Sequence, residues 1–259
     1  MTGRIVLAFD CAGRELSVAL GRGGEVLAAR RERRLRGHGE RLFGLIQEVL
    51  SEAGLNYADL DMIAVTRGPG SFTGLRIGLA AARGLALAGG QPVFAATTFE
   101  LAMASVPVAQ AEGRHIVALV DSKRRDLFVQ IATLGRDKRG SEPIGDPFAA
   151  EPAQLDDLLP AGRLLLCGDG AAAAVDSLQA AGRSVLVPAE AAGLDARWLL
   201  SLADGADREK LPPVRPLYLR PPDVTLPTPS GSTTRGSEPL GPKMSETTGA
   251  NEDGPGDAV

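Results

Sequence analysis

The sequence contains few of the residues that build metal centres and disulfide frameworks. Its 259 residues include two cysteines, Cys11 and Cys167, and two histidines, His38 and His115. The cysteines are far apart in the chain and have no metal-ligand spacing, which favours a reducing compartment over a disulfide framework. Neither histidine has another histidine, a cysteine or an acid at ligand spacing. The sequence therefore predicts no metal site.

Long apolar runs and a strong net charge are also missing. No uncharged apolar run is long enough to cross a bilayer, and Asp10 interrupts the apolar N-terminal stretch too early for a signal peptide. The formal net charge is −4, of which −3 falls on the last 34 residues. A nearly neutral remainder argues against a protein that coats nucleic acid or a membrane through bulk charge. We expect a soluble cytoplasmic protein without membrane contact.

Glycine and proline are abundant by contrast, and they are unevenly distributed. From Leu226 to Val259, 20 of 34 residues are Gly, Pro, Ser or Thr. Such a segment cannot bury enough apolar surface to offset the entropy lost on ordering, so a disordered tail is predicted over residues 226–259. The residues before it are numerous enough to bury a substantial core.

The chain also contains an internal repeat. Residues 4–21 and 115–132 align without a gap, and six positions are identical, among them Asp10 and Asp121. Each copy has the pattern of a buried strand, an Asp, a short turn and a returning strand, followed downstream by a further strand, glycines and a helix. Chance is the weaker explanation. We predict two copies of one α/β unit, residues 1–105 and 106–225.

Asp10 and Asp121 end the first strand of each copy. In duplicated nucleotide-binding folds an Asp at this place presents a phosphate or a metal, so the two carboxylates are expected to face each other across a cleft. Each Asp would alternatively cap its own turn through the backbone. The bulky, charged turn after Asp121 favours capping there, and for Asp10 both interpretations stay open.

The segment from Thr66 to Gly78 is the most unusual in the chain. Its glycines and proline follow a predicted strand and lead into a helix that Ser71 or Thr73 would cap. It lacks the ending of a Walker loop and the dinucleotide fingerprint, but its free amides could hold an anion. The candidate phosphate loop consists of Asp10, Cys11, Gly68, Gly70 and Ser71.

The helix predicted over residues 73–88 carries two rows of small residues. The first row is Gly74, Gly78, Ala82 and Ala86, and the second is Ala80, Gly84 and Ala88. Because glycine inside a helix costs about 1 kcal/mol relative to alanine, a row of this kind predicts very close approach of a neighbour. Packing within the subunit and packing against a partner's helix both meet that condition.

A second amphipathic helix is predicted over residues 40–53, with an apolar side broad enough for a core or an interface. Six arginines precede it or lie in its first turn: Arg30, Arg31, Arg33, Arg34, Arg36 and Arg41. This cluster is either a solvated strand end, which is the favoured interpretation, or a strip that contacts RNA.

Several of these segments together resemble the TsaB family, also called YeaZ. They are Ile5–Asp10, Gly37–Glu40 before the helix, Gly68–Gly78, Asp121 with its hairpin, and Arg215–Arg220. The resemblance covers residues 4–227. It implies the actin-like ATPase fold, built from two RNase-H-like halves. It also implies a role in N6-threonylcarbamoylation of the adenosine beside the anticodon in tRNAs that read ANN codons.

The resemblance further implies a non-catalytic dimerisation subunit. The related transferase TsaD has a His-x-x-x-His metal motif, and this sequence has Thr98 and Ala102 at the corresponding positions, which supply no imidazole. The implied partners are TsaD, the ATPase TsaE, tRNA through the complex, and a second copy when alone. The resemblance implies no cofactor bound by this chain alone. It places ATP or ADP at the interface between the subunits of the complex. Cys11 replaces a frequent Thr, which weakens nucleotide binding at the first loop.

Helices 40–53 and 73–88 resemble the pair that forms a helical bundle with TsaD or with a second copy. The interface residues expected from them are Leu42, Phe43, Ile46, Thr73, Gly74, Arg76, Ile77, Gly78 and Ala82. Leu at Gly78 or Ala82 would then prevent docking before it unfolds the subunit. The alternative function is a stand-alone small-molecule kinase or ATPase, with Asp10 and Asp121 around a Mg-nucleotide.

Overall fold

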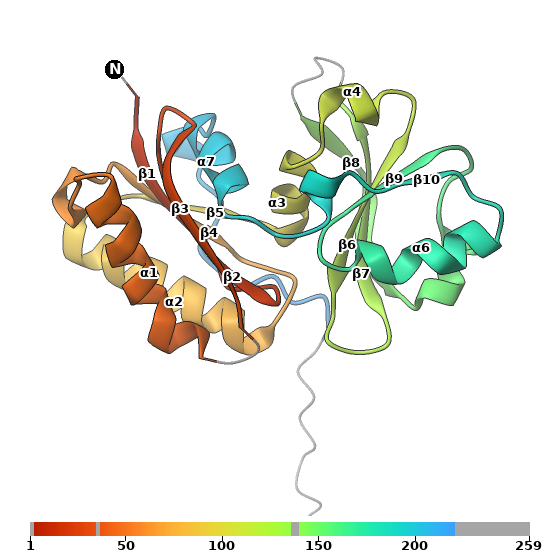
Figure 1. The fold of residues 1–259 in the computed structure, drawn as a ribbon, viewed down its shortest axis with the longest axis horizontal. Helices are drawn as coiled ribbons and strands as arrows, with labels where there is room; N and C mark the ends of the chain where they lie inside the picture. The colour runs from red at the N-terminus through yellow and green to blue at the C-terminus, as the bar shows by residue number, and fades with distance from the viewer. Residues whose placement is uncertain (1–2, 35–36, 136–139, 221–259) are drawn as a thin grey trace, which may run out of the picture. The chain divides into compact units, whose positions relative to one another are not determined.

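Two mixed five-stranded sheets form the framework of the protein (Figure 1). The computed structural model describes residues 3–34, 37–135 and 140–220, so the predicted tail lies outside the described residues. The first sheet has the order β3-β2-β1-β4-β5 and the second the order β10-β9-β6-β7-β8. The strands are β1 Ile5–Asp10, β2 Glu15–Arg22, β3 Glu25–Arg33, β4 Met62–Thr66, β5 Val93–Ala96, β6 His115–Asp121, β7 Leu127–Leu134, β8 Ser141–Ala150, β9 Leu164–Cys167 and β10 Val185–Leu186.

The second sheet repeats the topology of the first. In the first, β1 pairs antiparallel with β2 and parallel with β4. In the second, β6 pairs antiparallel with β7 and parallel with β9. Counted from β6, the second sheet has the same strand order as the first counted from β1. The predicted duplication of an α/β unit is therefore confirmed.

Seven α-helices connect or cover these strands in the described part of the chain. They are α1 His38–Glu52, α2 Phe72–Gly89, α3 Thr98–Ala104, α4 Val108–Ala111, α5 Leu155–Leu158, α6 Ala171–Ala180 and α7 Arg197–Asp204. The helices predicted over residues 40–53 and 73–88 are confirmed as α1 and α2. None of the helices in the described ranges combines the length and the apolar character of a membrane span.

Helices cover both faces of the first sheet, which is why its strands are almost continuously apolar. Along β1, alternate side chains point to opposite faces. Leu7 and Phe9 share a core cluster with α1 and α2, whereas Val6 and Ala8 belong to a second cluster with α3 and α7. Figure 1 shows α1 and α2 next to each other on one face of this sheet.

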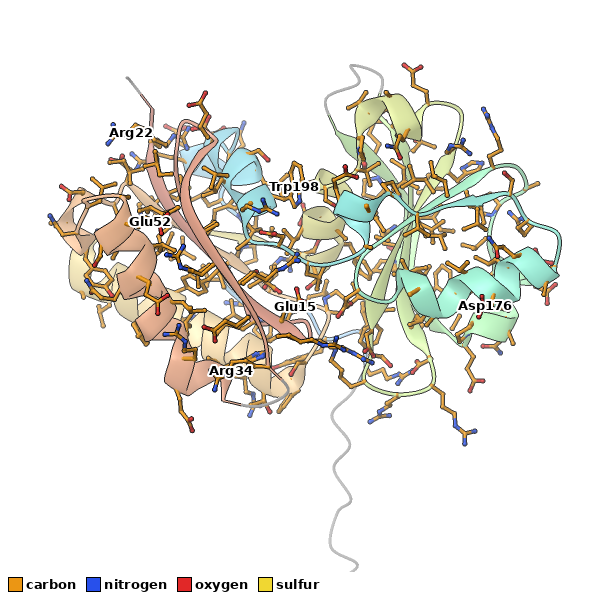
Figure 2. The ribbon with its side chains drawn as sticks, viewed as in Figure 1. Glu15, Arg22, Arg34, Glu52, Asp176 and Trp198 are labelled. Carbon is orange, nitrogen blue, oxygen red and sulfur yellow. The ribbon has the colours of Figure 1, made fainter. Side chains whose placement is uncertain are left out.

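The last helix of each half packs on the sheet of the other half. Helix α3 follows β5 but contacts β6, and α7 follows β10 but contacts β1 and β2. Trp198 on α7 packs against the core that the two halves share (Figure 2). The predicted boundary at residue 105 stays a prediction, and the structure adds that the chain after β10 returns to the first sheet.

Candidate functional site

The glycine-rich loop between β4 and α2 packs against the first hairpin, which connects β1 and β2. Ser71 caps α2 by accepting a hydrogen bond from the Gly74 amide at 3.2 Å, and its own amide donates to the Ala12 carbonyl at 2.8 Å. A Cβ on Gly70 would lie 2.8 Å from that carbonyl oxygen. The glycine is thus needed because two backbone segments approach each other closely.

The first row of small residues on α2 faces the protein's own core. A Cβ on Gly74 would overlap the Cys11 carbonyl oxygen, and one on Gly78 would lie 3.4 Å from the Val65 side chain. Five of the nine residues predicted to contact a partner are buried within the subunit: Leu42, Ile46, Gly74, Gly78 and Ala82. For these five the prediction is wrong, because they face the first sheet and the first hairpin within the subunit.

The second row of small residues lies on the opposite side of α2 and is exposed. Leu87 is 89% exposed and Phe43 on α1 48% exposed, and a Cβ on Gly84 would meet open space. Helices α1 and α2 touch near their starts, where a Cβ on Gly39 would lie 3.6 Å from Ile77. We call the following exposed or half-exposed residues the outer face: Phe43, Thr73, Arg76, Ile77, Ala80, Gly84, Leu87 and Ala88. Its first four members were predicted to contact a partner, and that stays a prediction.

Asp10 is sealed inside the protein at the end of β1. Its Oδ1 accepts hydrogen bonds from the Ala12 amide at 3.1 Å and from the Thr66 hydroxyl. Its Oδ2 is buried without a hydrogen-bond partner in the described structure. Burial raises the pKa of Asp10 to about 6, although the bonds from Thr66 and Ala12 lower it. Asp10 therefore caps its own turn, which was one of the two interpretations left open.

The carboxylate that faces Asp10 from the second half is Asp169 and not Asp121. An atom at the Cβ position of Gly13 would lie 3.8 Å from Asp10 Oδ2 and 3.3 Å from Asp169 Oδ2. Burial also raises the pKa of Asp169, and the negative charge of Asp169 contributes to the raised pKa of Asp10. Sequence reasoning missed Asp169, although its position in Gly168-Asp169-Gly170 directly after β9 was a usable signal.

Asp10 is expected to make stability depend on pH. Because its pKa is higher in the folded protein than the usual 3.8, the stabilisation is complete below about pH 4 and is lost as the pH rises through about 6. Relative to Asp10→Asn, the wild type should lose up to about 3 kcal/mol of unfolding free energy between about pH 4 and about pH 7. Urea unfolding of both proteins at these pH values measures the difference, and parallel pH profiles would contradict the assignment.

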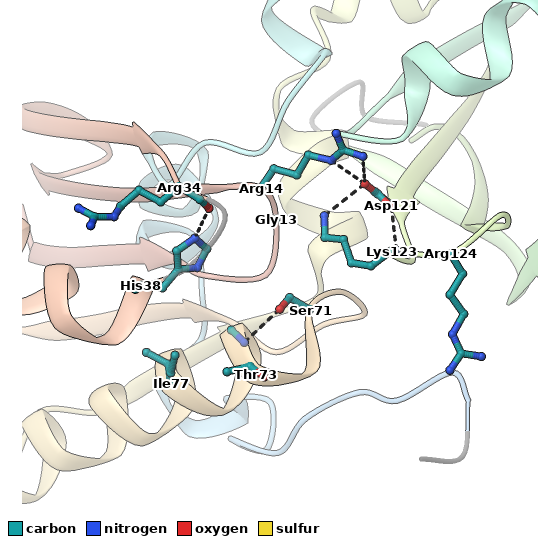
Figure 3. Close-up of a pocket in the computed structure, with 12 residues that line it drawn as sticks. Gly13, Arg14, Arg34, His38, Ser71, Thr73, Ile77, Asp121, Lys123 and Arg124 are labelled. Carbon is teal, nitrogen blue, oxygen red and sulfur yellow. Dashed lines mark hydrogen bonds and ion pairs between the residues drawn. The ribbon is translucent and has the colours of Figure 1, made fainter. Parts of the chain in front are cut away.

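Asp121 is held by cations from both halves of the protein (Figure 3). Arg14 Nε donates to its Oδ2 at 2.8 Å, and Lys123 donates its amide to Oδ1 at 2.7 Å and lies with Nζ 3.3 Å from Oδ2. Burial alone would raise the pKa of Asp121, but these hydrogen bonds and the charge of Lys123 lower it. The capping interpretation of Asp121 is confirmed. With this carboxylate neutralised and Asp10 sealed, the pair does not fit a Mg-nucleotide.

Two cavities open beside these groups. The helix-side cavity, of about 650 Å³, is lined by the starts of α1 and α2 and by Arg14, Asp121, Lys123 and Arg124 (Figure 3). The α6-side cavity, of about 670 Å³, is lined by Arg33, Arg125 and Asp169, among others. Ser71 lines the helix-side cavity, whereas Asp10 and Cys11 are buried in the core. The five residues of the candidate phosphate loop therefore do not converge on one pocket, and that hypothesis is not supported.

Most of the arginine cluster before α1 is paired with acids of the same subunit. Arg31 lies 3.0 Å from Glu15, and Arg41 lies 2.7 Å from Glu32 and 2.6 Å from Glu48. Arg30 pairs with Glu48 and Glu52, and Arg34 with Glu32. Arg36 lies outside the described residues. The favoured interpretation as a surface strand end fits these pairs better than a continuous RNA-binding strip does.

The positions that correspond to the transferase's metal histidines lie in the core. Thr98 and Ala102 on α3 are fully buried, and the Thr98 amide donates to the Gly68 carbonyl at 2.9 Å. No group of three or more His, Cys, Asp or Glu residues that could hold a metal occurs in the described part of the chain. A metal at these two positions would have no imidazole and only one hydroxyl, which is a poor ligand.

Comparisons with known proteins agree with this architecture. YeaZ from Pseudomonas aeruginosa has a structure that matches with a TM-score of 0.61 and 26% identity over 83% of this chain and 100% of that chain. TsaB of Escherichia coli (strain K12), named as a tRNA threonylcarbamoyladenosine biosynthesis protein, is 34% identical over 135 residues, 52% of this chain. The chain belongs to the TsaB/YeaZ family. Its fold is accordingly the actin-like ATPase fold of that family.

The share of each chain that is covered differs from one relative to the next. The alignment spans 57% of the Escherichia coli TsaB, a little over half of its length. An uncharacterised protein of Mycobacterium tuberculosis (strain ATCC 25618 / H37Rv) is 31% identical over 221 residues, 85% of this chain and 93% of the relative. Residues 31–158 match the family described as TsaD, tRNA N6-adenosine threonylcarbamoyltransferase. That segment includes α1, α2 and the hairpin between β6 and β7.

Proposed function

We propose that this chain is the non-catalytic dimerisation subunit in N6-threonylcarbamoylation of the adenosine beside the anticodon in ANN-reading tRNAs. The TsaB/YeaZ family connects it with tRNA threonylcarbamoyladenosine biosynthesis, the process named for the Escherichia coli relative. Residues 31–158 are similar to the transferase family TsaD, so this chain is a paralogue of that enzyme. This similarity supports TsaD as the partner. A function on tRNA also implies a cytoplasmic protein.

The observation that carries the proposal is the outer face of α1 and α2. Its row of Ala80, Gly84 and Ala88 is exposed, and so are the large apolar side chains of Leu87 on the same helix and Phe43 on α1. Two helices can approach to the short end of the usual interaxial range of about 8–10 Å when small residues line the contact. Isolated exposed apolar side chains are ordinary, but a set gathered on one helix pair is typical of an interface. TsaD is the proposed occupant, with a second copy in its place when the chain is alone.

The interactions of Asp10 and Asp121 and the residues at positions 98 and 102 support a subunit without catalytic activity. Asp121 is neutralised by Arg14 and Lys123, and Asp10 holds its own turn. Thr98 and Ala102 offer no metal-binding imidazole. We propose that TsaE and tRNA join through the complex, and that ATP or ADP binds at the complex interface and not on Asp10 and Asp121.

The protein mixed with TsaD is expected to elute as a heterodimer, because no described segment of the chain covers the outer face of this helix pair. Adding it to TsaD, TsaE and unmodified tRNA should be required for threonylcarbamoyladenosine formation, whereas the chain alone should hydrolyse no ATP above background. Size-exclusion chromatography with mass measurement and nucleoside analysis test this. ATP-dependent phosphorylation of a metabolite by the chain alone would contradict it and favour a kinase.

A further inference from the structure

The hairpin between β6 and β7 differs in charge from its counterpart in the first half. The first hairpin reads Cys11-Ala12-Gly13-Arg14, and the second reads Ser122-Lys123-Arg124-Arg125. Two small residues of the first copy are thus replaced by two cations, at Lys123 and Arg124. Lys123, Arg124 and Arg125 are all exposed. Since both hairpins have the same place in a duplicated unit, the added charge is not required by the topology.

The backbone of this hairpin is fixed by its own polar groups. Ser122 Oγ donates to the Asp126 carbonyl at 2.6 Å and accepts from the Arg124 amide at 3.2 Å. Its acids point inward: Asp121 is 8% exposed and Asp126 7% exposed. Asp121 is paired with Arg14 and Lys123, and Asp126 with Arg220. The tip is therefore held in place with its cations outward and its anions neutralised.

Arg125 shares a cavity wall with Arg33, which ends β3 in the other half. Both arginines line the α6-side cavity of about 670 Å³, both are exposed, and neither has an ion pair within the described ranges. Besides Asp169, the acids that line this cavity are Glu15, which pairs with Arg31 at 3.0 Å, Asp121, which pairs with Arg14 at 2.8 Å, and Glu190; five arginines line it as well. The mouth of the cavity is consequently cationic.

The floor of the same cavity has the opposite charge. Asp169 lines it with a buried Oδ2 that has no hydrogen-bond partner in the described structure, 3.6 Å from Lys123 Nζ. Asp10 lies behind Gly13 on the same side. Acids at the bottom disfavour a phosphate deep in the cavity, whereas guanidinium groups at the mouth favour one there. An extended polyanion satisfies both conditions, because it crosses the mouth without entering.

We propose that Arg33 and Arg125 bind successive phosphates of an RNA backbone that crosses the mouth of the α6-side cavity. The choice of RNA over another polyanion rests on the proposed function, and the placement rests on the charges of the cavity. Arginine is suited to this role because its planar guanidinium donates two parallel hydrogen bonds to one phosphate. The contact positions the RNA and reads no sequence.

The test measures binding of unmodified tRNA by fluorescence anisotropy over a salt series, for the chain alone and for its complex with TsaD. Arg33→Gln and Arg125→Gln are each expected to reduce the slope of log affinity against log salt by about 0.7–0.9. The double variant should bind roughly tenfold more weakly at low salt. Arg163→Gln is the matched control, because Arg163 is exposed and precedes β9 at the opposite end of β6 from the hairpin.

The outcomes separate this proposal from the proposed function. An unchanged slope in both arginine variants, an equal loss in Arg163→Gln, or no wild-type binding alone and in the complex would overturn the RNA contact. Competition by free ATP for the same arginines, without an effect on tRNA, would assign a nucleotide instead and also overturn it. If the slopes fall as expected but TsaD does not bind, the RNA contact stands and the proposed dimerisation role fails.

Discussion

Gly84→Arg is expected to abolish docking on TsaD while the subunit stays folded. A Cβ at Gly84 meets open space, so a long side chain fits the isolated protein without strain. In the complex the guanidinium would be buried between two helices without a carboxylate. An uncompensated buried charge costs about 3–5 kcal/mol, which is roughly a hundredfold or more in Kd. Titration calorimetry with TsaD measures the loss, and urea unfolding of the variant alone checks the fold.

Gly84→Ala is the matched control for this substitution. It adds one methyl group at the same place, and replacing an exposed helical glycine by alanine stabilises a helix by up to about 1 kcal/mol. Docking should remain within a few fold of the wild type, because alanine already occupies the neighbouring positions Ala80 and Ala88 of the row. If Gly84→Arg binds TsaD as tightly as Gly84→Ala does, the outer face is not the docking surface.

Gly74→Ala is expected to destabilise the folded subunit itself, although the chemical change is the same as in Gly84→Ala. The added Cβ would overlap the backbone carbonyl oxygen of Cys11, which cannot rotate away as a side chain would. Moving α2 away from the first hairpin would also strain the Ser71 to Ala12 hydrogen bond. Overpacking of this kind costs typically 1–3 kcal/mol and occasionally more, so about 3 kcal/mol is expected here. Urea unfolding measures it.

The comparison of Gly74→Ala with Gly84→Ala decides between the two faces of α2. Both glycines belong to one helix and both gain one methyl group, and helix propensity favours alanine over glycine in both variants. Opposite signs of the change in unfolding free energy are expected because one glycine is buried against the sheet and the other is exposed. Equal stabilisation of both would mean that the first row does not pack on Cys11.

The sequence predicted the two rows of small residues on α2 but not which row faces the core. The spacing of small residues identified two rows correctly, but a helical period gives the faces of a helix without saying which one points inward. Assigning the first row to a partner gave three buried residues, Gly74, Gly78 and Ala82, as interface residues. The apolar residues that decide the direction, such as Val65 on β4, are brought to α2 by the parallel pairing of β1 and β4.

Contacts between the two halves were likewise beyond what the sequence could predict. The sequence placed an Asp at the end of each first strand, and both aspartates are there. It could not show that Asp10 faces Asp169, since the two lie 159 positions apart in the chain and meet only when the halves are packed together. Nor could it show that Arg14 pairs with Asp121. The same holds for the arginines before α1, most of which pair with acids from β2, β3, α1 and the segment before α7.

What the sequence by itself determined about this protein is local: the strands of the repeat, the two long helices and the duplicated order of elements. These follow from periodicity, turn residues and repetition, which act between near neighbours in the chain. The tertiary structure alone decided which row of α2 is outside, which half α3 and α7 cover, and which charges remain unpaired. Each depends on groups distant in sequence, whose meeting is set by the packing of two sheets around a shared core.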